Sequence, residues 1–508
     1  MPAFDTHAPL LPEILALHGR WKGSKHALVS AQKTVSWQDF NSTTNRIANA
    51  LIKSGISSSS MVGVVMTNGI PMVETLVGIM KSGACSVPIN LSVSDEAMQA
   101  MLDDAGVSVI FTTADQAHRL KGYTGTRIIT VGDNYEAFLN SGSDETPDVQ
   151  IGPNDPLNVI YSSGTTGMPK GILHTHKARR DWAYDLAIAL RYNSASRTLF
   201  TIGLYSNISW VGMLCTLLAG GTMYIHEKFD AEAALQSIED HKITNFAMVP
   251  IQYQRLMEVE GHERFDLSSI EAVMSCGSPL HADLKTALFD RLGPKAVIEL
   301  FGLTEGLITT LDPEEAEGRM ASVGKPLIGT DIKIIGDDEK EVPMGQSGEI
   351  VGVGRILMPM YLNRPEATAE ATWIDEDGRH WFRTGDVGQL DEEGYLYIVD
   401  RKKDMILSGG QNIYPQDIEA VMIGHPDIND VAVIGVPSPT WGETPLAVVV
   451  PEAGNTATAG DITRWANERL GKQQRICGTE FIDTLPRNPN GKILKRDLRD
   501  TFGGKSHG

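Results

Sequence analysis

The feature that most constrains the fold is a regular alternation of helical patterns and short apolar strands between Val35 and about Leu300. Such alternation predicts a layered α/β architecture with largely parallel strands. Ligands of these sheets tend to bind in loops beyond the carboxyl ends of the strands. The segments that carry the pattern are 36–55 (helix), 61–68 (strand), 71–84 (helix), 85–90 (strand), 240–250 (strand), 269–280 (strand) and 281–293 (helix).

Beyond about Ala321 the sequence changes to short strands punctuated by glycines, which is typical of antiparallel sheet. A charged cluster at 400–404 then precedes about 100 residues in which helical and strand patterns alternate again. Few contacts cross a solvated charge run between two apolar-patterned regions. We therefore predict a large, multi-layered domain at 1–400 with mostly parallel sheets and a β-rich subdomain, and a small α+β domain at 401–508.

The stretch from Leu204 to Ile225 has no charged residue and is as long as a membrane span. Asn207, polar hydroxyls and a pair of glycines at 220–221 interrupt its apolar run. We therefore interpret it as a buried helix, a glycine turn and a strand, and expect no membrane span.

Composition excludes several classes of function. The chain has 44 Lys plus Arg against 64 Asp plus Glu, a net charge of −20, and this field repels nucleic acids and anionic lipid headgroups. The four cysteines show no CxxC or Cys/His spacing, so neither zinc nor a disulfide framework is expected. The first residues lack the pattern of a secretory signal, and the last carry no lipidation or peroxisomal signal. We expect a cytoplasmic protein; its oligomeric state is not readable.

The segment YSSGTTGMPKG at 161–171 is the strongest candidate for chemistry. Glycines, four hydroxyls and one lysine after an apolar strand suit a loop that wraps polyphosphate, although a surface turn without a ligand has the same composition. The segment is not a Walker A loop, because Pro169 and Gly171 stand where that motif needs Gly and Ser or Thr. The candidate phosphate ligands are Ser162, Ser163, Gly164, Thr165, Thr166, Gly167 and Lys170.

This segment resembles the phosphate loop of the adenylate-forming enzymes, the superfamily of acyl-CoA and aryl-CoA synthetases, peptide-synthetase adenylation domains and luciferases. Further matches follow in the family's order over about 330 residues. They are FGLTE at 301–305, FRTGD at 382–386, DRKKDMILSGGQNIYPQDIE at 400–419 and PRNPNGK at 486–492. The predicted boundary after residue 400 also falls where that family has its hinge.

The resemblance implies two reaction steps. A carboxylate first attacks the α-phosphate of ATP to give an acyl-adenylate and pyrophosphate, and CoA then takes the acyl group. Because charge builds on the phosphates, catalysis is mostly positioning and electrostatic stabilisation. The implied roles are α-phosphate contact for Thr304, Mg²⁺ binding for Glu305, adenine and nucleotide contacts for Phe301, Gly302 and Gly277, and ribose contacts for Asp386 and Arg401.

The same resemblance assigns the catalytic lysine to Lys492, which bridges the carboxylate and the α-phosphate during adenylation. Lys403 occupies the hinge about which the small domain rotates between the two steps, and Gly409 and Gly410 match the strand along the pantetheine tunnel. Acetylation of Lys492 would remove a charge that adenylation needs, so a lysine acetyltransferase and a deacetylase are expected partners.

The acid pocket departs from the family pattern. Tyr205 matches the aromatic of a PLFH motif, but Ser206 stands at the histidine position, and CGSPL at 276–280 replaces GGAPL. We see no Arg or Lys in the expected wall, which favours an apolar aliphatic or aromatic acid over a dicarboxylate. The expected substrate contacts are Tyr205, Ser206, Trp210, Tyr253, Ser275, Cys276 and Leu307.

The sequence therefore predicts an AMP-forming carboxylic acid:CoA ligase of fatty or aromatic acid metabolism, using ATP, Mg²⁺ and CoA. Two alternatives remain open at this stage. A stand-alone adenylation enzyme would load a phosphopantetheinyl carrier protein instead of CoA. A non-catalytic nucleotide sensor would share the fold without the chemistry.

Overall fold

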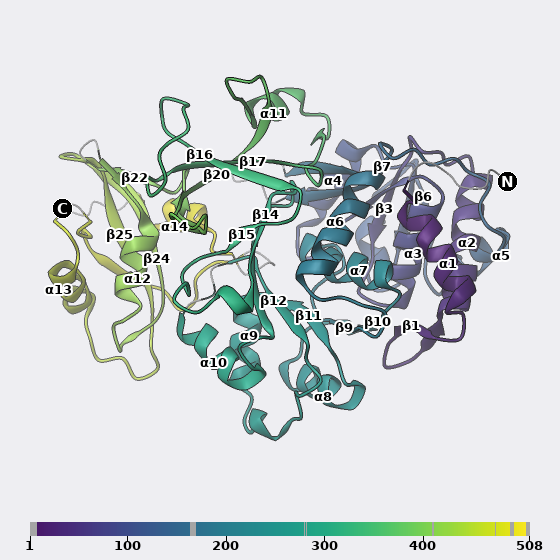
Figure 1. The fold of residues 1–508 in the computed structure, drawn as a ribbon, viewed down its shortest axis with the longest axis horizontal. Coiled ribbons are helices and arrows are strands. Elements are labelled where there is room, and N and C mark those ends of the chain that lie inside the picture. Colours follow the sequence, from purple (N-terminus) through teal and green to yellow (C-terminus); the bar gives the residue numbers. More distant parts are fainter. Residues whose placement is uncertain are drawn as a thin grey trace. The chain divides into compact units, whose positions relative to one another are not determined.

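A computed structural model describes residues 8–162, 169–278, 280, 282–408, 411–472, 474–487 and 492–503. The chain forms two compact units (Figure 1). The first comprises 1–320, 326–331 and 353–380, and the second comprises 321–325, 332–352 and 381–508.

One sheet of the first unit runs in the order β14-β13-β12-β11-β9-β10-β1-β2 and is parallel except at its outer pairs β13·β14 and β1·β2. The carboxyl ends of β12 and β13 therefore meet at one edge, where ligands of parallel sheets tend to bind. The strands are β1 (His26–Val29), β2 (Thr34–Ser36), β9 (Arg197–Phe200), β10 (Thr222–Ile225), β11 (Asn245–Met248), β12 (Ala272–Ser275), β13 (Val297–Gly302) and β14 (Ile308–Leu311).

The second sheet of this unit runs β18-β8-β7-β4-β3-β5-β6. Strands β7, β4, β3, β5 and β6 are mutually parallel, whereas β8 returns antiparallel to β7. This return sets Ser162 opposite Lys170, at the two ends of the predicted phosphate loop. The strands are β3 (Met61–Val65), β4 (Cys85–Pro88), β5 (Val109–Thr112), β6 (Arg127–Thr130), β7 (Pro156–Ser162), β8 (Lys170–Thr175) and β18 (Met360–Tyr361).

Helices of the first unit bury apolar faces against these sheets, and one continuous core contains residues from both sheets, such as Leu28 and Val64. Helix α3 is buried along its whole length, and α6 lies against α7. The helices are α1 (Leu11–Trp21), α2 (Trp37–Lys53), α3 (Ile70–Lys81), α4 (Asp95–Ala105), α5 (Tyr135–Asn140), α6 (His176–Ala189), α7 (Asn207–Ala219), α8 (Ala231–His241), α9 (Pro250–Met257), α10 (Ala282–Leu292) and α11 (Pro365–Glu370). Short 3₁₀ turns are η1 (Ala117–Leu120), η2 (His262–Arg264) and η3 (Pro313–Glu315).

The second unit contains an antiparallel meander, β17-β20-β21, and a further sheet in the order β23-β22-β25-β24 with β26 beside β25. Side chains of β24 alternate between two cores, one under α12 and α13 and the other under α14. This alternation is what a sheet covered on both faces requires. The elements are β16 (Thr330–Ile335), β17 (Gly348–Gly354), β20 (His380–Leu390), β21 (Leu396–Arg401), β22 (Ile406–Ser408), β23 (Gln411–Ile413), β24 (Ile428–Ser438), β25 (Gly442–Pro451), β26 (Thr479–Phe481), α12 (Pro415–Met422), α13 (Ala459–Arg469) and α14 (Lys495–Phe502); β15 (Lys325–Pro326) and β19 (Thr372–Ile374) complete the chain.

The structure confirms the predicted fold class: parallel α/β sheets first, then antiparallel strands and a small α+β segment. The uncharged stretch also folds as expected, because helix α7 ends at Gly220, which has φ 71° and caps the helix before β10. No helix among the described residues is long and apolar enough to cross a membrane.

Candidate active site

The ends of the predicted phosphate loop are held by a strand pair. Ser162 closes β7, Lys170 opens β8, and the two residues are register partners. Gly171 lies so close to Tyr161 that an added Cβ would come within 3.2 Å of its ring. The remaining predicted ligands of this loop, Ser163, Gly164, Thr165, Thr166 and Gly167, lie outside the described residues.

The FGLTE segment forms the tip of the β13–β14 hairpin. Phe301 and Gly302 end β13, and Thr304 and Glu305 occupy the turn. Gly306 follows with φ 110°, and an added Cβ there would lie 2.2 Å from the carbonyl oxygen of Ile356, so only glycine fits. The hairpin thus presents the predicted α-phosphate and metal ligands on a turn of fixed shape.

Tyr361, which the sequence analysis did not identify, lies between two predicted ATP-site residues. Its hydroxyl donates a 2.8 Å hydrogen bond to Oε1 of Glu305, and the Lys170 ammonium lies 4.9 Å from the centre of its ring. Burial and the neighbouring carboxylate raise the pKa of Tyr361 above its usual range, so the phenol remains a donor. Nothing in the local pattern around β18 marks this tyrosine, because the contact joins segments far apart in sequence.

A buried ion pair involves Glu299 on β13, the first strand of this hairpin. The Lys285 ammonium lies 2.7 Å from Oε2 of Glu299 on β13, with side chains only 2% and 9% exposed. Lys285 also donates to the carbonyl of Met320, and the other oxygen of Glu299 accepts from the main chain of Leu280 in the CGSPL segment. The pair therefore ties this segment to the strand that carries Phe301.

The predicted acid-site residues of 205–210 surround the start of α7. Ser206 is the N-cap, and its hydroxyl accepts from the main chain of Ile208. Tyr205 is partly buried, which raises the pKa of its phenol. Trp210 is fully buried, and its indole N–H donates to the carbonyl of Leu204 at 2.9 Å.

The other predicted acid-site residues lie in or after the neighbouring parallel strands. Tyr253 is fully buried and its hydroxyl donates to the carbonyl of Met274 at 2.8 Å. Ser275 ends β12, and its buried hydroxyl has no hydrogen-bond partner within the described part of the chain. Burial raises the pKa of the Cys276 thiol to about 12, which suits a small filler rather than a nucleophile. Leu307 is buried, and Gly277 has φ 90°.

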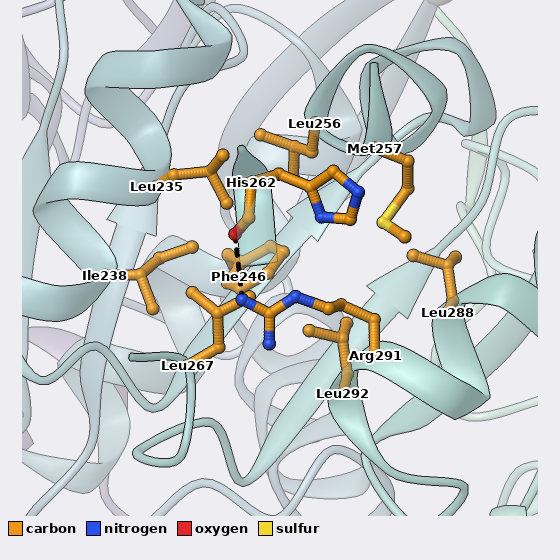
Figure 2. A pocket seen from close by; sticks show the side chains of 10 residues that line it. All are labelled: Leu235, Ile238, Phe246, Leu256, Met257, His262, Leu267, Leu288, Arg291 and Leu292. Atoms are coloured by element: carbon orange, nitrogen blue, oxygen red, sulfur yellow. Dashed lines mark hydrogen bonds between the residues drawn. The ribbon is translucent and has the colours of Figure 1, made fainter. Parts of the chain in front are cut away.

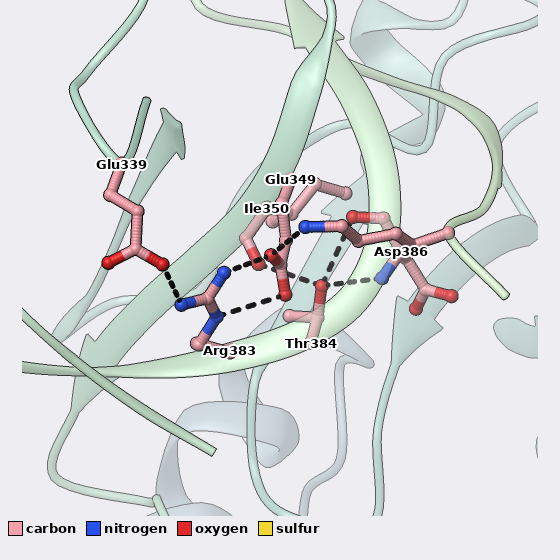
Figure 3. Close-up of polar contacts among 7 residues, drawn as sticks. Glu339, Glu349, Ile350, Arg383, Thr384 and Asp386 are labelled. Carbon is pink, nitrogen blue, oxygen red and sulfur yellow. Dashed lines mark hydrogen bonds and ion pairs between the residues drawn. The ribbon is translucent and has the colours of Figure 1, made fainter. Parts of the chain in front are cut away.

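In the second unit, the FRTGD segment lies within β20, where the hydroxyl of Thr384 bonds the main chain of Asp386 (Figure 3). Thr384 donates to the carbonyl of Ile350 and accepts from the main chain of Asp386 at 3.0 Å. Arg383 joins Glu339 and Glu349, each at 2.7 Å, and Lys402 lies 3.0 Å from the same Glu349 oxygen. Although burial raises the pKa of Glu349, these two cations outweigh it and keep the pKa below its usual value.

Asp386 is 3% exposed and forms an ion pair with Arg401. Its Oδ1 lies 3.0 Å from Nε of Arg401, while Oδ2 is buried without a hydrogen-bond partner among the described residues. Burial raises the pKa of Asp386, and the Arg401 and Lys492 charges oppose that shift. An unsatisfied buried acceptor costs free energy, so this oxygen suits a ligand hydroxyl.

Lys492 belongs to the same cluster. Burial and the Arg401 charge together lower the pKa of Lys492 to about 7, while the Asp386 charge opposes the shift. Lys403 is exposed in the turn after β21, and the adjacent Asp404 accepts 3.0 Å from Arg499. The predicted tunnel glycines, Gly409 and Gly410, lie outside the described residues.

An apolar pocket lies elsewhere in the first unit, between β11, α8, α9 and α10 (Figure 2). Its polar element is Arg291, whose Nη2 donates to the carbonyls of His262 and Phe265 at 3.0 and 2.8 Å. None of the predicted site residues lines this pocket, so it is separate from the candidate active site.

Comparison with known proteins shows the family to which the phosphate-loop, hairpin and lysine segments belong. Residues 18–362 match the AMP-binding enzyme family, and residues 417–492 match the AMP-binding enzyme C-terminal domain. A feruloyl-CoA synthase of Amycolatopsis is 35% identical over 473 residues, covering 92% of this chain and 94% of the relative. The long-chain-fatty-acid–CoA ligase FadD13 of Mycobacterium tuberculosis is 33% identical over 484 residues, covering 93% and 94%.

A solved structure agrees with these matches. The o-succinylbenzoate CoA synthetase MenE of Bacillus subtilis, in complex with an acyl-adenylate intermediate, superimposes with a TM-score of 0.86 at 28% identity, covering 97% of this chain and 99% of that one. The two family matches together include the phosphate loop, the FGLTE hairpin and Lys492. The chain therefore belongs to the AMP-binding enzyme family, within the superfamily of adenylate-forming ligases.

Proposed function

We propose that this protein is an AMP-forming acid:CoA ligase, which adenylates a carboxylic acid with ATP and transfers the acyl group to CoA. The observation that carries the proposal is the Asp386 cluster, where a buried carboxylate oxygen beside Arg401 and Lys492 has no hydrogen-bond partner among the residues that the structure describes. The free oxygen suits a ribose hydroxyl, and the lysine supplies positive charge for the reacting carboxylate and α-phosphate.

The ATP phosphates would be held from the first unit by Lys170 and the turn at Thr304. Glu305 would bind Mg²⁺, oriented by the hydrogen bond from Tyr361. No cluster of three metal-binding side chains occurs within the described ranges. A single carboxylate still fits Mg²⁺, because this ion keeps several waters and is commonly bound through one or two carboxylates and phosphate oxygens. The ion would neutralise charge that develops on the phosphates.

The acid is proposed to be aliphatic or aromatic. The relatives support both classes, since one is named for feruloyl-CoA and another for long-chain fatty acids. Tyr205 offers partly exposed aromatic surface next to α7, and the buried Trp210, Tyr253 and Leu307 make the packing of the surrounding elements apolar.

The second half-reaction is proposed to need rotation of a C-terminal domain at 401–508 about Lys403. The turn at this position is exposed and follows the end of β21 at Arg401, which suits a backbone that changes its φ and ψ angles there. Acetylation of Lys492 by an acetyltransferase would stop adenylation, because it removes the charge. We place the enzyme in the cytoplasm.

The test is AMP release from ATP with a panel of aliphatic and aromatic acids, with and without CoA. We expect AMP and an acyl-CoA in equal amounts, dependent on the acid, on CoA and on Mg²⁺. Turnover that ignores CoA but responds to a phosphopantetheinylated carrier protein would favour carrier loading. Nucleotide binding without turnover of any acid would favour a sensor.

A further inference from the structure

A buried arginine lies beneath the start of the acid-site helix α7. Arg179 on α6 is 1% exposed, its Nε donates to Oδ1 of Asn158 at 2.9 Å, and its Nη2 donates to Oδ1 of Asn207 at 2.8 Å. The guanidinium also lies 4.6 Å from the ring centre of Trp182 and 5.5 Å from that of Trp210. Such contacts with two indole faces stabilise a cation that burial has taken from water.

No described carboxylate pairs with this guanidinium, and burial alone lowers its pKa, to about 9. It is still charged at neutral pH. A guanidinium has donors and no acceptor, so each amide that contacts it must present its oxygen. Arg179 therefore determines which of the two amide atoms of Asn207, oxygen or nitrogen, faces the guanidinium. Without such a partner, the two orientations of an Asn amide cannot be told apart.

The consequence concerns the other end of the Asn207 amide. With Oδ1 held by Arg179, the two N–H groups of Nδ2 point away from the guanidinium, and no described residue accepts from them. The side chain is partly exposed, unlike Asn158, whose Nδ2 is buried. Asn207 thus presents a donor of fixed direction at the first turn of α7, whose dipole also favours an electron-rich group.

This donor lies among the residues assigned to the acid. Asn207 directly follows Tyr205 and Ser206, and Trp210 comes one turn later on α7. His174 on β8 is buried. Burial, and after it the Arg179 charge, lower the pKa of its ring well below the usual value, and the main chain of Thr304 opposes this shift.

We propose that Asn207 is a specificity-determining residue whose Nδ2 donates a hydrogen bond to an acceptor oxygen of the acid beyond its reacting carboxylate, with Arg179 as the positioning residue. The inference rests on the proposed ligase function and narrows its substrate class. The preferred acids carry a hydroxyl, alkoxy or carbonyl oxygen on the apolar part, in place of a plain hydrocarbon. Once a bound acid covers this donor, an analogue without an acceptor oxygen there would leave the donor unpaired and would bind more weakly.

The experiment compares matched acids that differ only in that oxygen. Benzoic acids with a methoxy or an ethyl group at each ring position, and straight-chain acids with or without one ether oxygen, are assayed for kcat/KM in acyl-CoA formation. We expect at least one oxygen-bearing acid to exceed its hydrocarbon partner by about three- to tenfold, the worth of one neutral hydrogen bond.

The key variant is Asn207→Asp, which keeps an acceptor for Arg179 but replaces the donor with a second carboxylate oxygen. It should abolish or invert the oxygen preference, and Arg179→Lys, which cannot hold both amides, should reduce it. The readout is the ratio of kcat/KM values within each matched pair, so a general loss of activity or folding does not affect it. The control is Gln32→Glu, which adds the same negative charge at an exposed position between β1 and β2. It should leave the ratio at its wild-type value.

Two results would overturn the inference: no oxygen preference in the wild type, or a preference that survives in Asn207→Asp because both members of every pair lose activity equally or not at all. An equal loss would mean that Asn207 serves the reacting carboxylate or the fold. Both outcomes require acid- and CoA-dependent turnover by the wild type. Absence of that turnover would instead refute the proposed function.

Discussion

Adenylation should slow by about tenfold between pH 6 and pH 8, because Lys492 titrates in this range. Burial and the Arg401 charge outweigh Asp386 and lower the pKa of Lys492 to about 7. A group with that pKa is about 90% protonated at pH 6 and about 10% protonated at pH 8. If only the ammonium form stabilises the charge that develops at the α-phosphate, the rate follows this fraction.

The assay is acid-dependent pyrophosphate formation in the absence of CoA, which isolates the first half-reaction. The profile of kcat/KM should bend near pH 7, since it reports groups of the free enzyme. The profile of kcat should bend at higher pH, because bound phosphates favour the charged lysine.

The matched variant is Lys492→Arg, whose guanidinium stays charged throughout this range. We expect a lower rate from altered geometry but no tenfold decline with pH. The reasoning would be refuted by a flat wild-type profile of kcat/KM, or by the same decline in Lys492→Arg, which would place the titration on another group.

Three further predictions concern the first unit. Lys285→Met should lower its free energy of unfolding by about 3–5 kcal/mol in urea denaturation, because it removes the cation that lies 2.7 Å from the buried Glu299 carboxylate. A Glu299→Gln change in the same protein should recover most of the loss, and failure to recover would contradict the ion-pair explanation. Burial raises the pKa of Glu74 to about 7. The folded state therefore keeps a proton on Glu74 that the unfolded state releases above about pH 4.5. The stability that this proton contributes should be complete below that pH and should fall as the pH rises to 7. Thermal unfolding of Glu74→Gln should lack this component, and an unchanged slope would exclude Glu74 as its source. Tyr361→Phe removes the hydrogen bond to Glu305 and should raise the KM for MgATP about three- to tenfold with an unchanged melting temperature; an unchanged KM would show that the tyrosine does not orient the carboxylate.

The sequence predicted the fold well where local patterns decide the outcome. Helical periodicity at 36–55 became α2, and the uncharged stretch at 204–225 became α7 and β10, because polar interruptions and the glycine pair mark their ends. The change to antiparallel strands after residue 321 followed from glycine spacing. The boundary between the two parts of the chain was less predictable. The charged cluster suggested a boundary after residue 400, whereas residues 381–400 share a compact unit with the residues after 400.

The candidate site was predictable only where a motif carries it. Thr304, Asp386 and Lys492 could be named from short segments, whereas Tyr361 and Arg179 act through contacts between distant segments that no local pattern contains. The contact between Arg179 and Asn207 could not be predicted for the same reason. Arg179 lies on the helix after the phosphate loop, and only the packing of α6 against α7 brings it to Asn207.

The most direct test of the central claim separates the two half-reactions in Lys492→Ala. Acid-dependent exchange of pyrophosphate into ATP measures the first step, and thioester formation from a synthetic acyl-adenylate and CoA measures the second. The account predicts that exchange falls by at least about a hundredfold, as for loss of a group that stabilises transition-state charge, while thioester formation continues. Wild-type rates in both assays would contradict the role of Lys492, and inability of the wild type to form thioester from any adenylate would contradict the ligase function.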